Sequence, residues 1–256
     1  MSTLFELRRY RLKPGAFDDL LTLFEREFVH TQQAVGMDVP AIYRDIDDPD
    51  AFVWLRSFEN IDARAKALAT FYNGEAWNRF GPAANATMVN SDNVLLLAPR
   101  SLGSDFVPTS GARQESAAGA AEKGLITISI CSLAPGREQE FATFFETEAR
   151  PLIEQAGARI DATFVTAAER NSFPRLPVRE GEPVFVWIAA FPNAKAEETY
   201  RSKLRQSAAW QEKGFPELDR RLWRPIETAQ LIPTGRSRHR WWGGVSSRPF
   251  TRSAGG

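Results

Sequence analysis

The sequence predicts an α+β protein with two tandem ferredoxin-like repeats, each a βαββαβ unit with one antiparallel sheet and both helices on a single face. The first supporting observation is a repeated segment: FVWLRSFEN at residues 52–60 returns as FVWIAAFPN at residues 185–193, an offset of 133 (185 − 52). The same offset places Ala76-Trp77 on Ala209-Trp210. The stretch at 99–123 is rich in Gly, Ala and Ser and poor in large apolar residues, which is typical of a linker between two folded units.

The first repeat, residues 1–98, carries local signals for each element. Gly36 is a suitable residue to end the first helix, and Asn60 is a good N-cap for the second helical region. Within that region, Gly74 and Gly81-Pro82 predict breaks. Apolar residues three and four positions apart predict the amphipathic first helix: Phe17, Leu20, Leu21, Phe24 and Phe28. The predicted elements are a strand at 3–12, a helix at 16–36, strands at 39–44 and 51–58, a helical region at about 61–88 and a buried strand at 94–97.

The second repeat, residues 124–233, follows the same order. Its first strand, 125–133, corresponds to 3–12 at an offset of 121, and the offset has grown to 133 by the third strand. The second repeat therefore has 12 extra residues (133 − 121), which lie within 166–183. Asn193 caps its second helical region, and 226–232 is the last predicted strand. The basic tail at 234–256 is expected to be flexible.

Composition limits the class of protein. The chain has 256 residues and a formal net charge of zero. With one cysteine, Cys131, it cannot form an internal disulfide. We interpret Cys131 as a small buried thiol. No run of about 18 apolar residues is present, and the first residues lack the features of a secretion signal. We expect a cytoplasmic protein without a membrane span.

Five segments of the first repeat resemble the NIPSNAP family in sequence and in order. They are ELRRYRLKPG at 6–15, VWLRSF at 53–58, Ala63-Arg64, Trp77 and NVLLL at 93–97. The resemblance covers nearly all of residues 3–99 and, more weakly, 124–232. It implies a dimeric α+β barrel, in which two ferredoxin-like sheets face each other and helices cover the outside, here with both halves in one chain. That superfamily includes cofactor-free monooxygenases, isomerases, haem-degrading enzymes and plain binding proteins, so the fold does not decide the function.

The candidate site is placed in a cavity between the two sheets, on the first repeat's side. The first strands differ there, since Glu6, Arg8 and Tyr10 stand opposite Thr127, Ser129 and Cys131. We expect the charged side chains to point into the barrel, with Arg8 anchoring an anion and Glu6 or Tyr10 carrying protons. The alternative is a structural ion pair. In both cases the opposite face of this strand, with Phe5, Leu7 and Arg9, is expected to pack against the helices. Trp54 and Trp187 are either aromatic residues of the cavity or part of the core.

Other candidates carry weaker signals. His30 could be a base or a haem ligand at the cavity mouth, or an ordinary surface histidine. No cluster with zinc spacing, calcium loop or phosphate loop is present, so we expect no metal and no cofactor. The tail combines arginines with Trp241 and Trp242. Nucleic-acid binding by it is not expected, and homo-oligomerisation is left open.

Two classes of function use the predicted cavity, and a third does not. The chain would bind a small anionic or aromatic molecule there, as a cofactor-independent enzyme acting by proton transfer or oxygenation. It could equally bind or sense that molecule without turnover. The third alternative is a protein-interaction module that uses the outer surface and the basic tail.

Overall fold

A computed structural model describes residues 2–103, 106 and 124–241 of the chain. Eight strands form its centre. The first repeat supplies β1 (Leu4–Leu12), β2 (Asp38–Asp45), β3 (Ala51–Phe58) and β5 (Val94–Leu102), and the second supplies β6 (Leu125–Ser132), β7 (Arg159–Thr166), β8 (Val184–Phe191) and β9 (Glu227–Pro233). They pair in the order β1-β3-β2-β9-β6-β8-β7-β5 and back to β1, always antiparallel. The sheet is therefore a closed barrel, as predicted.

The two repeats are joined by strand pairing at two places. At the β2–β9 junction, Tyr43 lies opposite Pro233. At the β5–β7 junction, Pro99 lies opposite Phe164. Each junction pairs a second strand with a last strand of the other repeat. Neither repeat closes a barrel alone, so the inner face of each sheet is covered only by the other.

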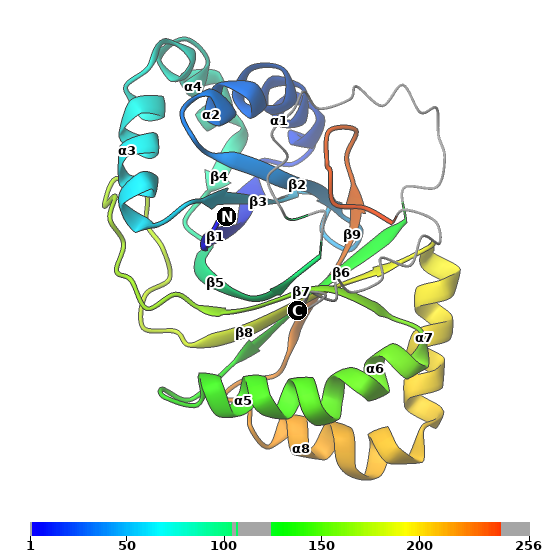
Figure 1. The fold of residues 1–256 in the computed structure, drawn as a ribbon. Coiled ribbons are helices and arrows are strands. Elements are labelled where there is room, and N and C mark those ends of the chain that lie inside the picture. Colours follow the sequence, from blue (N-terminus) through cyan, green and yellow to red (C-terminus); the bar gives the residue numbers. More distant parts are fainter. Residues whose placement is uncertain (1, 104–105, 107–123, 242–256) are drawn as a thin grey trace, which may run out of the picture.

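Helices cover the outside of the barrel, with those of the two repeats on opposite sides (Figure 1). The first repeat contributes α1 (Phe17–Leu23), the π-helical turn η1 (Phe24–Phe28), α2 (Val29–Ala34), α3 (Ile61–Tyr72) and α4 (Glu75–Thr87). The second contributes α5 (Glu138–Phe144), the π-helical turn η3 (Phe145–Ala149), α6 (Arg150–Ala156), α7 (Ala194–Gln206), the π-helical turn η4 (Trp210–Gly214) and α8 (Phe215–Asp219). Within the described residues, no helix is both long and apolar enough to cross a membrane.

Three apolar cores fill the space between these layers. The barrel interior holds side chains from both sheets, such as Phe5 and Leu7 with Ile126 and Ile128. A second core lies between the first repeat's sheet and its helices, and a third lies between the second repeat's sheet and its helices. Both faces of β1 and β3 are thus largely buried, which matters for the position of the site.

Local signals explain several helix boundaries. Asn60 accepts a hydrogen bond from the Ala63 amide at 2.9 Å, and Asn193 accepts one from the Ala196 amide at 2.9 Å, so both predicted N-caps are confirmed. Gly157 ends α6 with a φ of 118°, a left-handed conformation that suits glycine.

The structure differs from the sequence expectations at three places. The helix α4 continues through Gly81-Pro82. Gly81 leaves room for the Trp77 ring, which lies 2.7 Å from where a Cβ would be. A short extra strand, β4 (Met88–Asn90), pairs with β1, and β5 extends beyond 98 into the predicted linker. Most of that linker lies outside the described residues.

The tail is the third difference. Thr234, Ser237 and His239 are buried, so the part of the tail up to residue 241 packs against the barrel, while 242–256 lie outside the described residues. His239 Nδ1 lies 2.6 Å from Tyr43 Oη of the first repeat, and Nε2 lies 2.8 Å from Asp161 Oδ2 of the second. The tail thus links the two repeats at one end of the barrel.

Candidate functional site

Glu6, Arg8 and Tyr10 lie on the outer face of β1, beneath the helices of the first repeat, and not inside the barrel. Tyr10 belongs to the core between sheet and helices, whereas Phe5 and Leu7 belong to the barrel interior. The predicted orientation of this strand is therefore wrong. The alternation of apolar and polar residues could not show which face of β1 points into the barrel, because both faces are buried. The more apolar face was assigned to the helices, and it lies inside the barrel.

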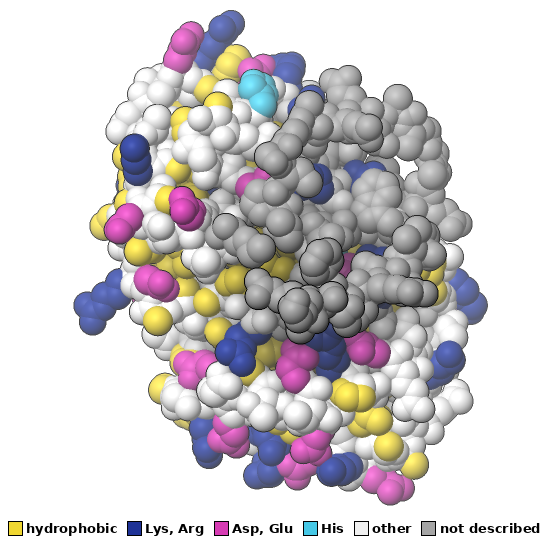
Figure 2. All heavy atoms as spheres, in the orientation of Figure 1, with side chains coloured by type: hydrophobic (Ala, Val, Ile, Leu, Met, Phe, Trp, Pro, Cys, Tyr) yellow, Lys and Arg dark blue, Asp and Glu magenta, His cyan; other side chains and the backbone are white. Residues whose placement is uncertain are grey.

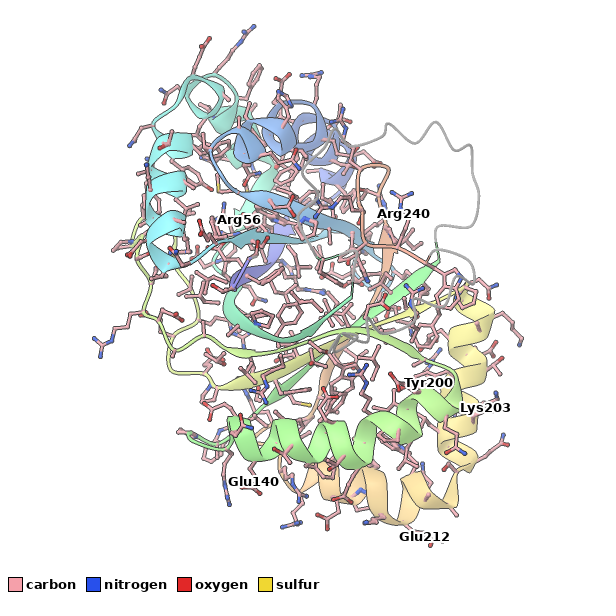
Figure 3. All side chains as sticks on the ribbon, in the orientation of Figure 1. Arg56, Glu140, Tyr200, Lys203, Glu212 and Arg240 are labelled. Carbon is pink, nitrogen blue, oxygen red and sulfur yellow. The ribbon has the colours of Figure 1, made fainter. Side chains whose placement is uncertain are left out.

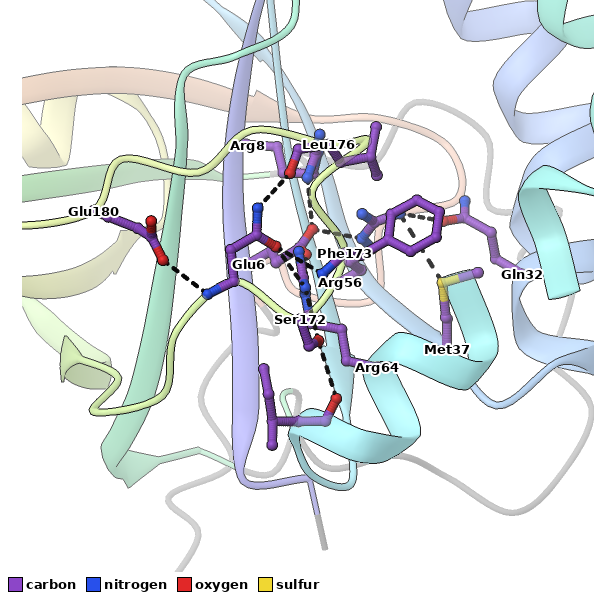
Figure 4. A network of polar contacts seen from close by, with 12 residues as sticks. Glu6, Arg8, Gln32, Met37, Arg56, Arg64, Ser172, Phe173, Leu176 and Glu180 are labelled. Atoms are coloured by element: carbon purple, nitrogen blue, oxygen red, sulfur yellow. Dashed lines mark hydrogen bonds and ion pairs between the residues drawn. The ribbon is translucent and has the colours of Figure 1, made fainter. Parts of the chain in front are cut away.

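Glu6 is the centre of a buried ionic cluster (Figure 4). Its Oε2 accepts hydrogen bonds from Arg8 Nη1 and from Arg56 Nε, both at 2.6 Å, and its Oε1 accepts one from Arg64 Nε at 2.6 Å. Glu6 and these three arginines are each at most 1% exposed. Strands β1 and β3 and helix α3 bring them together: Arg56 lies opposite Glu6 in the β1–β3 register, and Arg64 extends from the first turn of α3.

The cluster holds more positive than negative charge. Three guanidinium groups share one carboxylate, and the remaining contacts of the arginines are with neutral groups. Arg8 Nε donates to Tyr10 Oη at 2.8 Å, and Arg56 Nη1 donates to Gln32 Oε1 at 3.4 Å. Among the described residues, Arg56 Nη2, Arg64 Nη2 and Trp54 Nε1 have no hydrogen-bond partner, although all three atoms are buried. Buried donors without partners are unusual in native proteins and call for an explanation.

The charges set the protonation states of the site. Burial would raise the pKa of Glu6, but Arg56, Arg8 and Arg64 together hold that pKa well below its usual range, so Glu6 stays ionised. A carboxyl group held in its ionised form is poorly suited to carry protons, and that role of Glu6 stays a prediction. Burial raises the pKa of Tyr10 despite the nearby Arg8 charge, so Tyr10 remains a neutral phenol. Its oxygen accepts from Arg8, and as a neutral phenol it keeps a proton that it can donate.

A small cavity lies next to this cluster, between the sheet and the helices. Its volume is about 30 Å³, enough for one or two water molecules. Tyr10, Gln32 and Trp54 line it and also contact the arginines: the guanidinium carbons of Arg8 and Arg56 lie 5.7 and 5.3 Å from the Trp54 ring centroid. The rest of the lining is mainly aromatic, with Phe24, Phe28, Phe71, Tyr72 and Trp77.

The insertion of the second repeat, residues 167–183, covers the site of the first repeat (Figure 4). Asn171 Oδ1 and Ser172 Oγ accept hydrogen bonds from Arg64 Nη1 at 3.0 and 3.1 Å. The Phe173 ring stacks on Tyr72 with centroids 5.9 Å apart. The exposed Arg175 places its guanidinium carbon 5.4 Å from the Tyr72 ring centroid. The site is therefore built from both halves of the chain.

The second repeat lacks a comparable cluster at the corresponding positions. The positions of Glu6 and Arg8 hold Thr127 and Ser129, and Ser129 Oγ lies 3.0 Å from Thr228 Oγ1. Ala189 and Glu197 stand where the first repeat has Arg56 and Arg64. Figure 3 shows Arg56 within the body of the first repeat, whereas the labelled Glu140, Lys203 and Glu212 extend outward from the second repeat's helices. The charged network thus lies in the first repeat, although not in the barrel interior where it was predicted.

The π-helical turn near the cavity is not itself a mark of function. It carries Phe24 and Phe28, which line the cavity. Such turns often accompany functional sites. The second repeat has the same turn at Phe145–Ala149 without the ionic cluster, so the turn belongs to the architecture of the repeat.

The other predicted residues are not brought to the site. Trp187 is buried in the second repeat's core, where it packs on Phe145 with ring centroids 5.0 Å apart. His30 is exposed on α2, so it is a surface histidine and not a residue of the cavity. Cys131 is fully buried, and burial raises the pKa of its thiol. Trp54 is the exception among these remaining candidates, because it lines the cavity. Among the residues that the structure describes, no group of three or more potential metal ligands occurs.

Sequence reasoning missed Arg56, Arg64, Gln32 and Tyr72. A signal for the two arginines was available, because Arg56 and Arg64 correspond to Ala189 and Glu197 within segments that otherwise match. Comparing the copies face by face along the third strand and the following helix, and not only along the first strand, would have found them. Gln32 and Tyr72 give no such signal.

Comparison with known proteins agrees with this architecture. A putative monooxygenase from Lactobacillus acidophilus NCFM aligns over 91% of this chain and 94% of its own, with a TM-score of 0.55 and 10% identity. A protein described as anthrone oxidase-like aligns over 91% and 92%, with a TM-score of 0.61 and 12% identity. A putative monooxygenase from Fusobacterium nucleatum aligns over 91% and 92%, with a TM-score of 0.56 and 9% identity. At these identities the likeness establishes the fold alone.

Sequence comparison identifies the first repeat more directly. No match to the chain was found among curated proteins. The sequence model of the NIPSNAP family matches residues 5–101, which include Glu6, Arg8, Tyr10, Arg56 and Arg64. The NIPSNAP family model thus covers the half of the chain that carries the ionic cluster, within a single-chain α+β barrel.

Proposed function

We propose that the chain binds a small aromatic molecule between the sheet and the helices of the first repeat, with a polar end of that molecule at Tyr10. The observation that carries the proposal is the cavity itself. Aromatic rings form most of its wall, and at one side they meet a neutral phenol that keeps a proton it can donate. Apolar walls with a few fixed polar groups are the usual composition of a site for small organic molecules.

Binding requires movement of the wall, because about 30 Å³ is smaller than any aromatic ring. We infer that the insertion moves, because it has no helix or strand of its own and its Phe173 ring covers the cavity by stacking on Tyr72 of the first repeat. A ligand that binds only the open state shifts the population toward that state.

A second candidate is turnover of the bound molecule by cofactor-independent oxygenation. The observation that favours it is the Arg8 Nε to Tyr10 Oη hydrogen bond of 2.8 Å, which holds Tyr10 as a donor to an oxygen that becomes negative during reaction. The names of the structural neighbours, putative monooxygenase and anthrone oxidase-like protein, are compatible with it. The cavity lining holds no carboxyl, imidazole or thiol group. The cavity therefore offers no general base, and a substrate would have to lose its proton without one. Binding without turnover is for this reason the better supported function.

The test is a melting experiment on the full chain with phenol and benzamide as probes. Each probe is expected to raise the melting temperature, since a ligand at 100 times its Kd stabilises a protein by about 2.7 kcal/mol. Ala84→Leu fills the cavity, because Ala84 is a buried residue of its wall, and should remove the shift. Ala142→Leu is the matched control, a buried alanine in the second repeat's core, and should keep it. No shift with either probe, or an equal shift in Ala84→Leu, would contradict the proposal.

A further inference from the structure

We propose that the ionic cluster of Glu6, Arg8, Arg56 and Arg64 is a carboxylate-binding subsite, so that the aromatic molecule bound by the first repeat is a carboxylic acid in its anionic form. This inference rests on the proposed function and adds the chemical class of the ligand. Its first support is charge. Three buried guanidinium groups share one carboxylate among the described residues, which leaves an excess of two positive charges (three minus one). Buried charges are normally paired.

The second support is the position of the donors without partners. Within a guanidinium group, Nη2 lies on the same edge as Nε. Since Arg56 Nε and Arg64 Nε both donate to Glu6, the two unpartnered Nη2 atoms lie on the edges of the guanidinium groups that face the Glu6 side. Trp54 Nε1 is a third donor without a partner, on a residue that lines the cavity. N–H donors from two guanidinium groups suit a planar anion with two oxygens.

The third support is that the fold does not need these charges. The second repeat builds the same layer of helices on sheet with Thr127, Ser129 and Ala189 in place of Glu6, Arg8 and Arg56. Its Glu197, at the position of Arg64, pairs with the half-exposed Arg201 at 2.9 Å. Three neutral side chains and one pair of a glutamate with a half-exposed arginine therefore satisfy the architecture, and a cluster of three buried arginines is costly to keep without a role.

The cavity lies beside the cluster, because Tyr10, Gln32 and Trp54 both line it and contact the arginines. The rings beyond Trp54 would contact the aromatic part of the ligand once the wall opens. The exposed Arg175 beside Tyr72 places a further positive charge on the covering insertion. Opposite charge at an entrance raises the local concentration of an anion.

The experiment compares benzoate with its neutral analogue benzamide, by calorimetric titration of the full chain at constant ionic strength. Benzoate is expected to bind at least about tenfold more tightly, because hydrogen bonds to a charged group are stronger than neutral ones. Formate, which has the anion without the ring, should raise the melting temperature above that in chloride. Phosphate tests the alternative anion in the same assay.

Two variants locate the effect. Arg56→Lys keeps the charge and loses Nη2, and should reduce the advantage of benzoate over benzamide by roughly tenfold. Arg64→Gln should do the same if it folds. Arg201→Gln is the matched control, since it removes an arginine from the helix that corresponds to α3, and should leave both affinities unchanged.

The outcomes separate this inference from the proposed function. Equal affinity for benzoate and benzamide overturns the carboxylate subsite and leaves the aromatic pocket in place. Stabilisation by phosphate with none by formate or benzoate overturns the choice of a carboxylate. Failure of phenol, benzamide and benzoate alike overturns the proposed function and this inference together. A benzoate advantage that persists in Arg56→Lys also contradicts the inference.

Discussion

At the scale of single residues, Glu6 does the most to hold the site together, because one carboxylate accepts hydrogen bonds from three buried arginines. Replacing it by glutamine leaves those arginines without an anionic partner. We expect Glu6→Gln to lower the free energy of unfolding by roughly 3–5 kcal/mol, as for other broken buried ion pairs. Denaturation in urea at neutral pH measures the change.

The matched control is Glu197→Gln in the second repeat. Glu197 is also a buried glutamate, but burial raises its pKa and its ion pair is with one half-exposed arginine, Arg201. Glutamine should be tolerated there with little loss of stability. Similar losses in both variants would show that Glu6 is not the centre of a special cluster.

The pKa of Glu6 also predicts how the stability of the protein depends on pH. The pKa of Glu6 is lowered in the folded protein, so the unfolded state binds a proton first as the pH falls. The contribution of Glu6 is fully present well above the unfolded pKa of about 4.3 and is lost progressively as the pH falls below it toward the folded pKa. The wild type should therefore lose more stability below this pH than Glu6→Gln does, and parallel pH curves would contradict the assignment.

At the scale of elements, the insertion at 167–183 decides whether the site is closed. Phe173 contacts Tyr72, which lines the cavity, and the neighbouring Ser172 and Asn171 bind Arg64. We expect Phe173→Ala to cost about 1–2 kcal/mol of stability, less than a fully buried phenylalanine because Phe173 is only half-buried. Its main effect should be faster hydrogen exchange in the insertion and at the C-terminal end of α3, measured by mass spectrometry.

The control for this variant is Phe215→Ala, which removes a partly exposed ring from α8 of the second repeat. It should not change exchange in the insertion. Unchanged exchange in Phe173→Ala as well would mean that the stacking contact does not hold the insertion closed. Faster exchange throughout the molecule would indicate general destabilisation instead.

Elements were also what the sequence predicted best. Local chemistry sufficed for Asn60 and Asn193, which cap their helices through their own side chains. It misled at Gly81-Pro82, where the glycine serves the packing of Trp77 and does not end the helix. Gly214 is packed in the same way, because a Cβ there would lie 2.8 Å from the Trp210 ring. The repeated spacing of tryptophan and glycine was thus a readable signal of packing.

At the scale of the whole molecule, the surface visible in Figure 2 carries acidic and basic side chains interspersed with apolar ones. Repetition in the sequence predicted the barrel but not which face of each strand points inward. The two faces of β1 are both buried, one by the other repeat and one by helices, so burial could not distinguish them. Comparison of the two copies therefore predicted the network of Glu6, Arg8 and Tyr10, which the structure contains, but placed it on the wrong side of the sheet.

The last prediction concerns the joining of the two repeats. The barrel interior contains apolar side chains of both sheets, and separating the repeats would expose them to water. Strand pairing at the β2–β9 and β5–β7 junctions and the contacts of His239 with Tyr43 and Asp161 also cross between the halves. A protease site inserted within 107–123 should therefore yield two fragments that stay together. Native mass spectrometry of the cleaved protein should show one species with the mass of both fragments, whereas separate fragments would mean that the linker, and not the shared core, holds the molecule together.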